Sequence, residues 1–127
     1  MSYDDLSKIE NYQNPLLSGP KEFQKKPVRI WAMQLPVNAT PAEGIAVYQW
    51  VERNTLGSFE PLDVIEGRRP CPASGVSIDP RDGRIIISTL EGLHWVDLGD
   101  FVIRGIKGEF YPCKPDIFVA SYDEVTA

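Results

Sequence analysis

GDFVIRGIKGEFYPCKPDIFVASYDEV, residues 99–125, combines two short apolar runs with a glycine-flanked turn. Residues 101–106 are rich in large apolar and β-branched side chains, which predicts a strand. Gly105 and Gly108 enclose a two-residue turn, and glycine tolerates the positive φ that such a turn needs. We therefore expect residues 109–111 to return as the partner strand of a hairpin.

Two prolines follow this hairpin. Because proline has no N–H to give to a sheet, we expect residues 112–115 to leave the sheet as an extended or turning connector. Residues 116–122 fit either a last edge strand or a helical turn. Between these, the sequence favours a short turn at residues 115–117 and then a strand.

Short apolar runs separated by turn residues precede the hairpin, and they predict an antiparallel meander. The expected strands cover residues 76–78, 84–90 and 93–98. Asp82 and Gly83 give a strong hairpin signal between the first two. Residues 28–35 are apolar on both alternating faces, which predicts a central strand.

Residues 40–43, Thr-Pro-Ala-Glu, carry the signature of a helix start. Thr40 can cap the helix, Pro41 fits its first turn and Glu43 completes a capping box. We expect a helix over residues 41–54. Its sheet-facing side should hold Ala46, Val47, Trp50 and Val51.

The chain is predicted to form one small α+β domain over residues 23–127, preceded by an N-terminal arm at 1–22. Its curled antiparallel sheet, an open meander or nearly a barrel, should be covered by one α-helix. Residues 58–80 are interpreted as a loop-rich insertion, with a short strand at 59–65 that Pro61 interrupts. The length of 127 residues and the 43% hydrophobic content agree with a single globular core.

Three stretches carry a resemblance to a known family: FQKKPVRIWAMQ, GRIIISTLEGLHWVDL and the C-terminal stretch quoted above. The chain resembles small proteins of tailed-bacteriophage and prophage genomes that begin near a Lys-Lys-Pro-Val strand and end on Gly-Glu-Phe-Tyr-Pro and Lys-Pro-Asp-Ile-Phe. The resemblance covers roughly half of the chain. It implies a phage origin and a fold, since the family carries no established activity. The chain departs from the family in residues 1–22 and 59–80.

The net charge of −5 disfavours broad nucleic-acid binding, because phosphate-binding proteins usually carry a basic surface. No apolar run reaches the length of a membrane span, and Asp4 and Asp5 stand where a signal peptide would be basic. We expect the protein to reside in the host cell cytoplasm, with Cys71 and Cys113 as free thiols.

Basic residues cluster just before the first strand: Lys21, Lys25, Lys26 and Arg29. They fit a solvated strand edge or a contact for an acidic partner. The arm and the exposed edges of the sheet are also compatible with a homo-oligomer.

No catalytic signature is recognised. His94 is the only histidine, and its spacing from Cys113 matches no nucleophile and base arrangement. One histidine and two distant cysteines do not form a usual zinc site, and no glycine-rich phosphate loop is present. We expect a protein without enzymatic activity, cofactor or metal.

The candidate binding residues flank the predicted hairpin: Arg104, Lys107, Tyr111 and Lys114. They could form a pocket for a small anionic ligand or a peptide, or simply be solvated. Arg104 interrupts an apolar strand face and so needs a partner. The acids expected to pair with it are Asp100, Glu109 and Asp116.

The predicted function is that of a phage accessory protein that binds a host protein or a small anionic ligand, in host takeover or defence evasion. One alternative is a minor virion or assembly component. The other is a small hydrolase with an unrecognised site, which would be tested by the loss of turnover on changing His94 or Cys113 to alanine.

Overall fold

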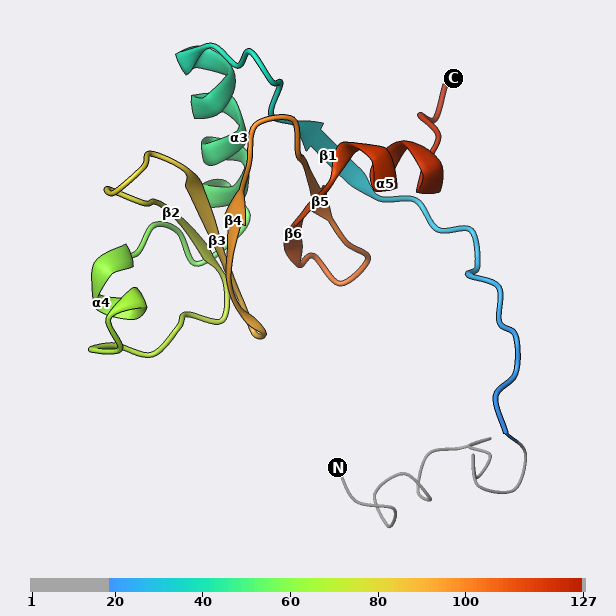
Figure 1. Ribbon diagram of the computed structural model, residues 1–127, viewed down its shortest axis with the longest axis horizontal. Coiled ribbons are helices and arrows are strands. Elements are labelled where there is room, and N and C mark those ends of the chain that lie inside the picture. The colour runs from blue at the N-terminus through green and yellow to red at the C-terminus, as the bar shows by residue number, and fades with distance from the viewer. Residues whose placement is uncertain (1–18, 127) are drawn as a thin grey trace.

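The computed structural model describes residues 19–126. In chain order, the elements of this part are β1 (Trp31–Gln34), α3 (Pro41–Arg53), α4 (Pro61–Ile65), β2 (Gly75–Ile78), β3 (Ile85–Thr89), β4 (Gly92–Val96), β5 (Phe101–Arg104), β6 (Phe110–Cys113) and α5 (Pro115–Ser121) (Figure 1). Of the arm predicted for residues 1–22, only residues 19–22 are described, and they are exposed.

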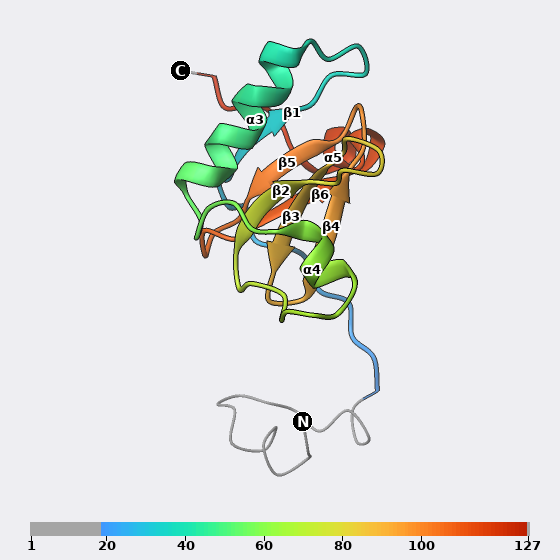
Figure 2. The ribbon, with the colours of Figure 1, turned by 90° about the vertical axis from the view of Figure 1, so that its left-hand side faces the viewer.

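The described strands form two antiparallel sheets of three strands each, in the orders β1-β5-β6 and β2-β3-β4. β6 lies against β3 and β4, so the two sheets curl around a shared interior without closing into a barrel. The helix α3 lies across one side of both sheets (Figure 2). The prediction of a small α+β domain with a curled antiparallel sheet is confirmed, in its open form.

One core joins α3 to both sheets. Its buried side chains are Leu35, Val47, Val51, Val76, Ile85, Ile87, Val96, Val102 and Phe110. The ring of Trp50 meets that of Phe110 edge-on, with centroids 5.0 Å apart and planes at 85°. This contact fixes α3 on β6, because edge-to-face aromatic pairs add to the stability gained from burial.

The start of α3 follows the sequence signal closely. The Glu43 N–H donates to Thr40 Oγ1 at 3.2 Å, and the Thr40 N–H donates to Glu43 Oε1 at 3.0 Å, which completes the predicted capping box. Val47 and Val51 are buried as expected. Ala46 is exposed, so its predicted place on the sheet-facing side is wrong.

The hairpin of β5 and β6 is confirmed, but it extends further than the sequence predicted. Pro112 lies within β6 opposite Val102, so the expectation that residues 112–115 leave the sheet is wrong for its first half. The Gly105 N–H donates to the Glu109 carbonyl, and these residues lie directly opposite each other. Hydrogen-bonded pairs alternate along antiparallel strands, which turns the nitrogen of Pro112 away from β5. No ladder bond is lost, because β6 is an edge strand.

The strand predicted after residue 117 is replaced by the helix α5. Pro115 occupies its first turn, where a missing N–H costs nothing, and Asp116 adds a favourable negative charge there. Phe118 stacks on Phe101 at 3.8 Å between ring centroids, so α5 covers the outer face of its sheet.

The first strand is also corrected. The predicted central strand at residues 28–35 is the edge strand β1, which pairs with β5 alone. Its two apolar faces have another cause: one face meets the core and the other lies on the side that α5 covers. A strand between two apolar layers can therefore be apolar on both faces at a sheet edge.

The short strand predicted at residues 59–65 is wrong, because Pro61–Ile65 forms the helix α4. Pro61 stands at the helix start and Asp63 in its first turn, which are both favoured positions. The remaining strands match their predicted positions within two residues. Cys71 and Cys113 are free, as expected.

Candidate functional site

The structure does not bring the four predicted binding residues together. Arg104 lies opposite Phe110, and Tyr111 lies opposite Ile103. Side chains of neighbouring strand residues point to opposite faces, so Arg104 and Tyr111 stand on different faces of the sheet. Lys107 is exposed in the hairpin turn. The binding role of these residues stays a prediction, but they do not line one pocket.

Arg104 has an aromatic partner instead of an acidic one. Its guanidinium lies 5.7 Å from the ring centroid of Phe110, a cation–π contact. None of the carboxylates in the described residues forms an ion pair with it, so the expected pairing with Asp100, Glu109 or Asp116 is wrong. The carboxylate of Glu109 accepts from the Lys107 N–H instead.

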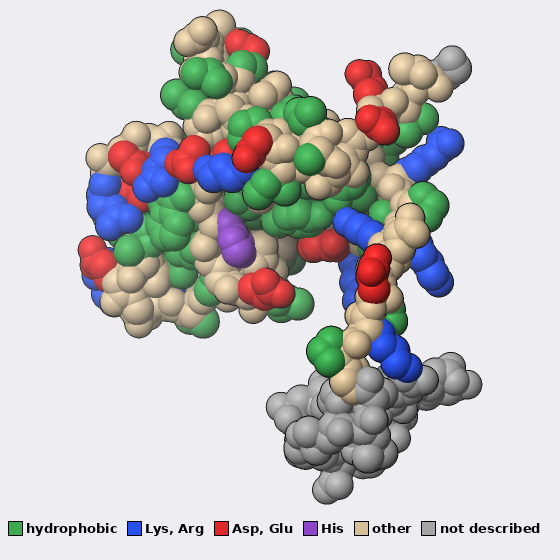
Figure 3. Space-filling model, turned by 45° about the vertical axis from the view of Figure 1, so that its right-hand side comes forward, with side chains coloured by type: hydrophobic (Ala, Val, Ile, Leu, Met, Phe, Trp, Pro, Cys, Tyr) green, Lys and Arg blue, Asp and Glu red, His purple; other side chains and the backbone are tan. Residues whose placement is uncertain are grey.

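Lys114 belongs to a structural ion network. Its Nζ atom lies 2.7 Å from Asp97 Oδ2 and 3.1 Å from Asp100 Oδ1, and Asp97 is also paired with Arg84. Hydrogen bonds from Lys114 and then Arg84 lower the pKa of the Asp97 carboxyl. Figure 3 shows acidic and basic side chains interleaved on this face. Lys114 therefore holds the end of β4 to the start of β5 and of α5.

The surroundings of Tyr111, Cys113 and His94 do not form a catalytic arrangement among the described residues. Burial, and then a hydrogen bond with Tyr122, raises the pKa of Tyr111 to about 12. Burial raises the pKa of the Cys113 thiol, which makes the reactive thiolate scarcer. The Nε2 atom of His94 lies 3.1 Å from the Thr89 hydroxyl, and within the described residues no hydrogen bond connects it to Cys113.

A concavity lies between α3 and the sheet β2-β3-β4. Its volume is about 720 Å³, and it is an open groove rather than a closed cavity. Its helix side comes from the outer face of α3, and its sheet side from β2, the β2–β3 turn, the first residue of β3 and the end of β4. We call this the α3 groove.

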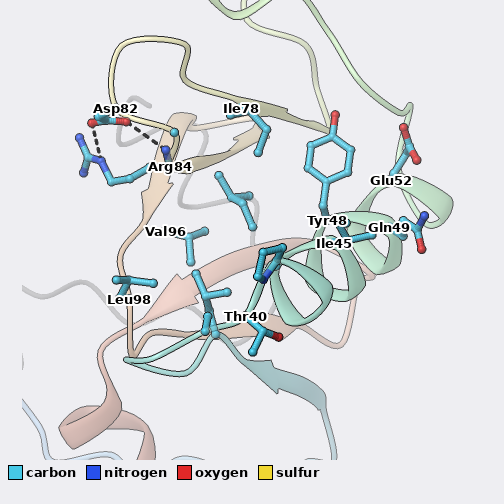
Figure 4. Close-up of a pocket in the computed structure, with 16 residues that line it drawn as sticks. Thr40, Ile45, Tyr48, Gln49, Glu52, Ile78, Asp82, Arg84, Val96 and Leu98 are labelled. Carbon is cyan, nitrogen blue, oxygen red and sulfur yellow. Dashed lines mark hydrogen bonds and ion pairs between the residues drawn. The ribbon is translucent and has the colours of Figure 1, made fainter.

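Apolar side chains dominate the α3 groove. Figure 4 shows Ile45 and Tyr48 on the helix side, facing Ile78, Val96 and Leu98 across the opening. Ile45, Ile78 and Leu98 are 55%, 42% and 62% exposed, which is high for three large apolar residues that share one depression. Apolar surface gathered in this way is typical of a contact site.

Polar groups stand at the rim of the α3 groove. Asp82 and Arg84 form an ion pair of 2.8 Å on the sheet side, and Glu52 and Gln49 lie on α3 (Figure 4). The pKa of Tyr48 is raised by burial and then by the charge of Glu52. A tyrosine hydroxyl is protonated at neutral pH, so that of Tyr48 can donate a hydrogen bond.

The groove lining offers no nucleophile with a free base. The Thr40 hydroxyl donates to Glu43 within the capping box. Across residues 19–126, no group of three or more His, Cys, Asp or Glu side chains could hold a metal ion. In the same range, no helix is both long and apolar enough to cross a bilayer. The arrangement can bind apolar groups and orient them with a polar rim.

Comparison of the chain with protein-family models, curated proteins and solved structures finds no match.

The α3 groove was missed because its walls are far apart in sequence. The available signal was weak: Ile45 and Tyr48 share a helix side that the predicted sheet-facing residues do not use. A second apolar side on a short helix indicates a second contact surface, but the sequence does not show that Ile78 and Leu98 face it.

Proposed function

We propose that the protein is a non-enzymatic binding protein and that the α3 groove receives an apolar segment of a protein partner. One observation carries this proposal: Ile45, Ile78 and Leu98, from three separate parts of the chain, expose their side chains in a single groove. Leaving such surface in water is unfavourable by about 25 cal/mol for each Å². A partner that covers it recovers this free energy.

A protein partner fits better than a small anionic ligand. The groove is wide and apolar, and its one basic residue, Arg84, is already paired with Asp82 and Asp97. An anion would have to displace these carboxylates. An amphipathic segment can bury apolar side chains against Ile45 and Leu98 and place its polar side at the rim.

The resemblance to phage proteins supports an accessory role in an infected host cell, such as host takeover or defence evasion. The binding partner is then a host protein. A minor virion component would use the same groove for a phage protein. Mass spectrometry of purified particles separates the two, because an accessory protein is absent from them.

The test is affinity capture from bacterial host cells with a matched pair of variants. Ile45 and Ile117 both lie on helices and are 55% and 56% exposed, but only Ile45 lines the groove. Ile45→Asp should lose the captured partner, because a carboxylate in an apolar contact is strongly unfavourable. Ile117→Asp should retain it. Equal capture by both variants, or no partner captured by the wild type, contradicts the proposal.

A further inference from the structure

The edge of β1 that faces away from β5 has hydrogen-bonding groups to offer. The Leu35 N–H donates to the Asp100 carbonyl at 2.9 Å, and these residues are opposite each other in the register that pairs Gln34 with Phe101. Bonded pairs alternate along the strand, so Met33 turns its backbone groups to β5. Ala32 and Gln34 turn theirs outward. No described residue donates to or accepts from these outward groups.

The outer edges of β6 and β2 are each blocked or occupied at one position. On β6, Pro112 removes an outward N–H. On β2, the outward Val76 N–H donates to the Gly57 carbonyl at 3.1 Å. β4 also contacts β6. The edge of β1 carries no proline between residues 31 and 34.

Basic residues without an ion-pair partner among the described residues lie in the segment before β1 and in the β5–β6 hairpin, and two of them, Arg29 and Arg104, lie beside Trp31. Lys25, Lys26, Arg29, Arg104 and Lys107 form no ion pair with described residues. Elsewhere in residues 19–126, ion pairs are formed by Arg68, Arg69, Arg81, Arg84 and Lys114. Figure 3 shows basic side chains gathered along the described part of the N-terminal arm. Glu22 and Glu109 are the acids of these segments, which leaves an excess of positive charge.

An exposed aromatic side chain adds an anchor. Trp31 is 77% exposed and lies opposite Arg104 at the start of β1. A hollow of about 280 Å³ lies between Arg29, Trp31, Arg104 and the hairpin turn. Tryptophan and arginine are the residues that most often carry interface energy. The hollow can therefore hold one side chain of a bound strand.

We propose that β1 binds an acidic peptide segment of a partner as an added strand, with Trp31 and the surrounding basic residues selecting its charge. The outward groups of Ala32 and Gln34 supply the backbone hydrogen bonds. This surface shares no residue with the α3 groove, so the two proposals are tested independently.

An acidic peptide fits this edge better than a second copy of the protein or a single-stranded nucleic acid does. A second copy would bring two sets of unpaired basic residues to one edge, where like charges repel. A single-stranded nucleic acid would satisfy the charges and stack on Trp31, but it has no strand backbone to match Ala32 and Gln34. The remaining explanation is that the lysines only protect the edge from aggregation, in which case no peptide binds.

The experiment uses ¹⁵N-labelled full-length protein and two capped heptapeptides, Ser-Glu-Val-Glu-Val-Glu-Ser and its counterpart with Lys in place of Glu. Hydrogen exchange is followed by NMR at the amides of Ala32, Met33 and Gln34. The acidic peptide should slow exchange at Ala32 and Gln34 and leave Met33 unchanged, because Met33 is already bonded to β5. The lysine peptide should protect neither, and added salt should weaken the effect.

Each other outcome overturns the proposal. If neither peptide slows exchange at Ala32 and Gln34, the basic residues only protect the strand edge from aggregation. Equal protection by both peptides removes the charge selection. Protection that rises with protein concentration alone identifies a second copy. Tighter binding of an oligothymidine, without protection at Ala32, identifies a nucleic-acid surface.

Three variants locate the site. Arg29→Glu should weaken the acidic peptide about tenfold, and Arg53→Glu, an unpaired arginine at the end of α3, should leave its affinity unchanged. Ala32→Pro removes one outward N–H and should abolish protection at Gln34. If Ala32→Pro fails to fold, the two arginine variants still decide, since equal affinity in both contradicts the proposal.

Discussion

The ammonium group of Lys114 lies 3.1 Å from Oδ1 of Asp100, whose side chain is only 3% exposed. The second oxygen of Asp100 accepts from the Asp97 N–H at 2.9 Å. One buried acid therefore anchors both the turn before β5 and Lys114, the residue just before α5. Removing its charge should loosen both the turn and the start of α5.

We expect Asp100→Asn to lower the free energy of unfolding by about 1–3 kcal/mol, because hydrogen bonds to charged groups are the strong ones. Urea unfolding followed by circular dichroism measures this change. Lys114→Met should also destabilise the protein, since it leaves Asp100 without its counter-charge. An Asn variant as stable as the wild type contradicts this role for Asp100.

Stability should fall in acid because of Asp79. Hydrogen bonds from the Arg81 side chain and N–H, and from the Trp95 indole, hold the pKa of this carboxyl well below its usual range. Below about pH 4 the unfolded chain takes up a proton that folded Asp79 refuses, so stability is lost as the pH falls. Above that pH the contribution is complete.

The matching variant is Asp79→Asn. Between about pH 4 and pH 2, the unfolding free energy of this variant should depend less steeply on pH than that of the wild type. The difference in slope should correspond to at most one proton fewer taken up on unfolding. The variant should still lose some stability in acid, because the pKa of Asp97 is also lowered in the folded protein. Identical slopes for the variant and the wild type would show that Asp79 titrates alike in the folded and unfolded chains.

The capping box of α3 can be tested with a conservative pair. Thr40→Ala should cost about 1 kcal/mol of stability, because the Glu43 N–H loses its acceptor. Thr40→Ser keeps the hydroxyl and should retain most of the stability. Thermal unfolding of both variants compares them directly, and equal losses would mean that the hydroxyl is not the relevant group.

Two glycines should respond in opposite directions to alanine. Gly75 has φ of 150°, and a Cβ there would lie 2.7 Å from the Gly57 carbonyl oxygen. Gly75→Ala should therefore destabilise the protein, by about 1–3 kcal/mol. Gly44 lies inside α3 with nothing within 4 Å of its Cβ position. Gly44→Ala should stabilise by up to about 1 kcal/mol. The denaturant midpoints of the two variants measure both changes. A Gly75→Ala variant more stable than the wild type would contradict the steric conflict expected at Gly75.

The sequence was informative where a structure depends on near neighbours. The start of α3 and the turn at Gly105 and Gly108 are set by residues within a few positions, and both were predicted. The position of Pro112 was wrongly predicted because the effect of a proline depends on which strand of the sheet it occupies. Pro112 is tolerated since its nitrogen points off an edge, and the identity of the edge strand is a tertiary property.

The candidate site was less accessible to prediction. Ile45, Ile78 and Leu98 meet only when α3 docks beside the sheet, and no local pattern records that docking. Arg104 was correctly marked as needing a partner, but Phe110 met the need where an acid was expected. An aromatic ring opposite an arginine in a hairpin is a signal that sequence reading could have weighed.

The affinity of the captured partner for three proteins, measured by titration calorimetry, tests the central proposal most directly. We predict that Ile45→Asp binds the partner at least about tenfold more weakly than the wild type does and that Ile117→Asp binds it as the wild type does. Equal affinity for all three proteins would contradict the assignment of the α3 groove.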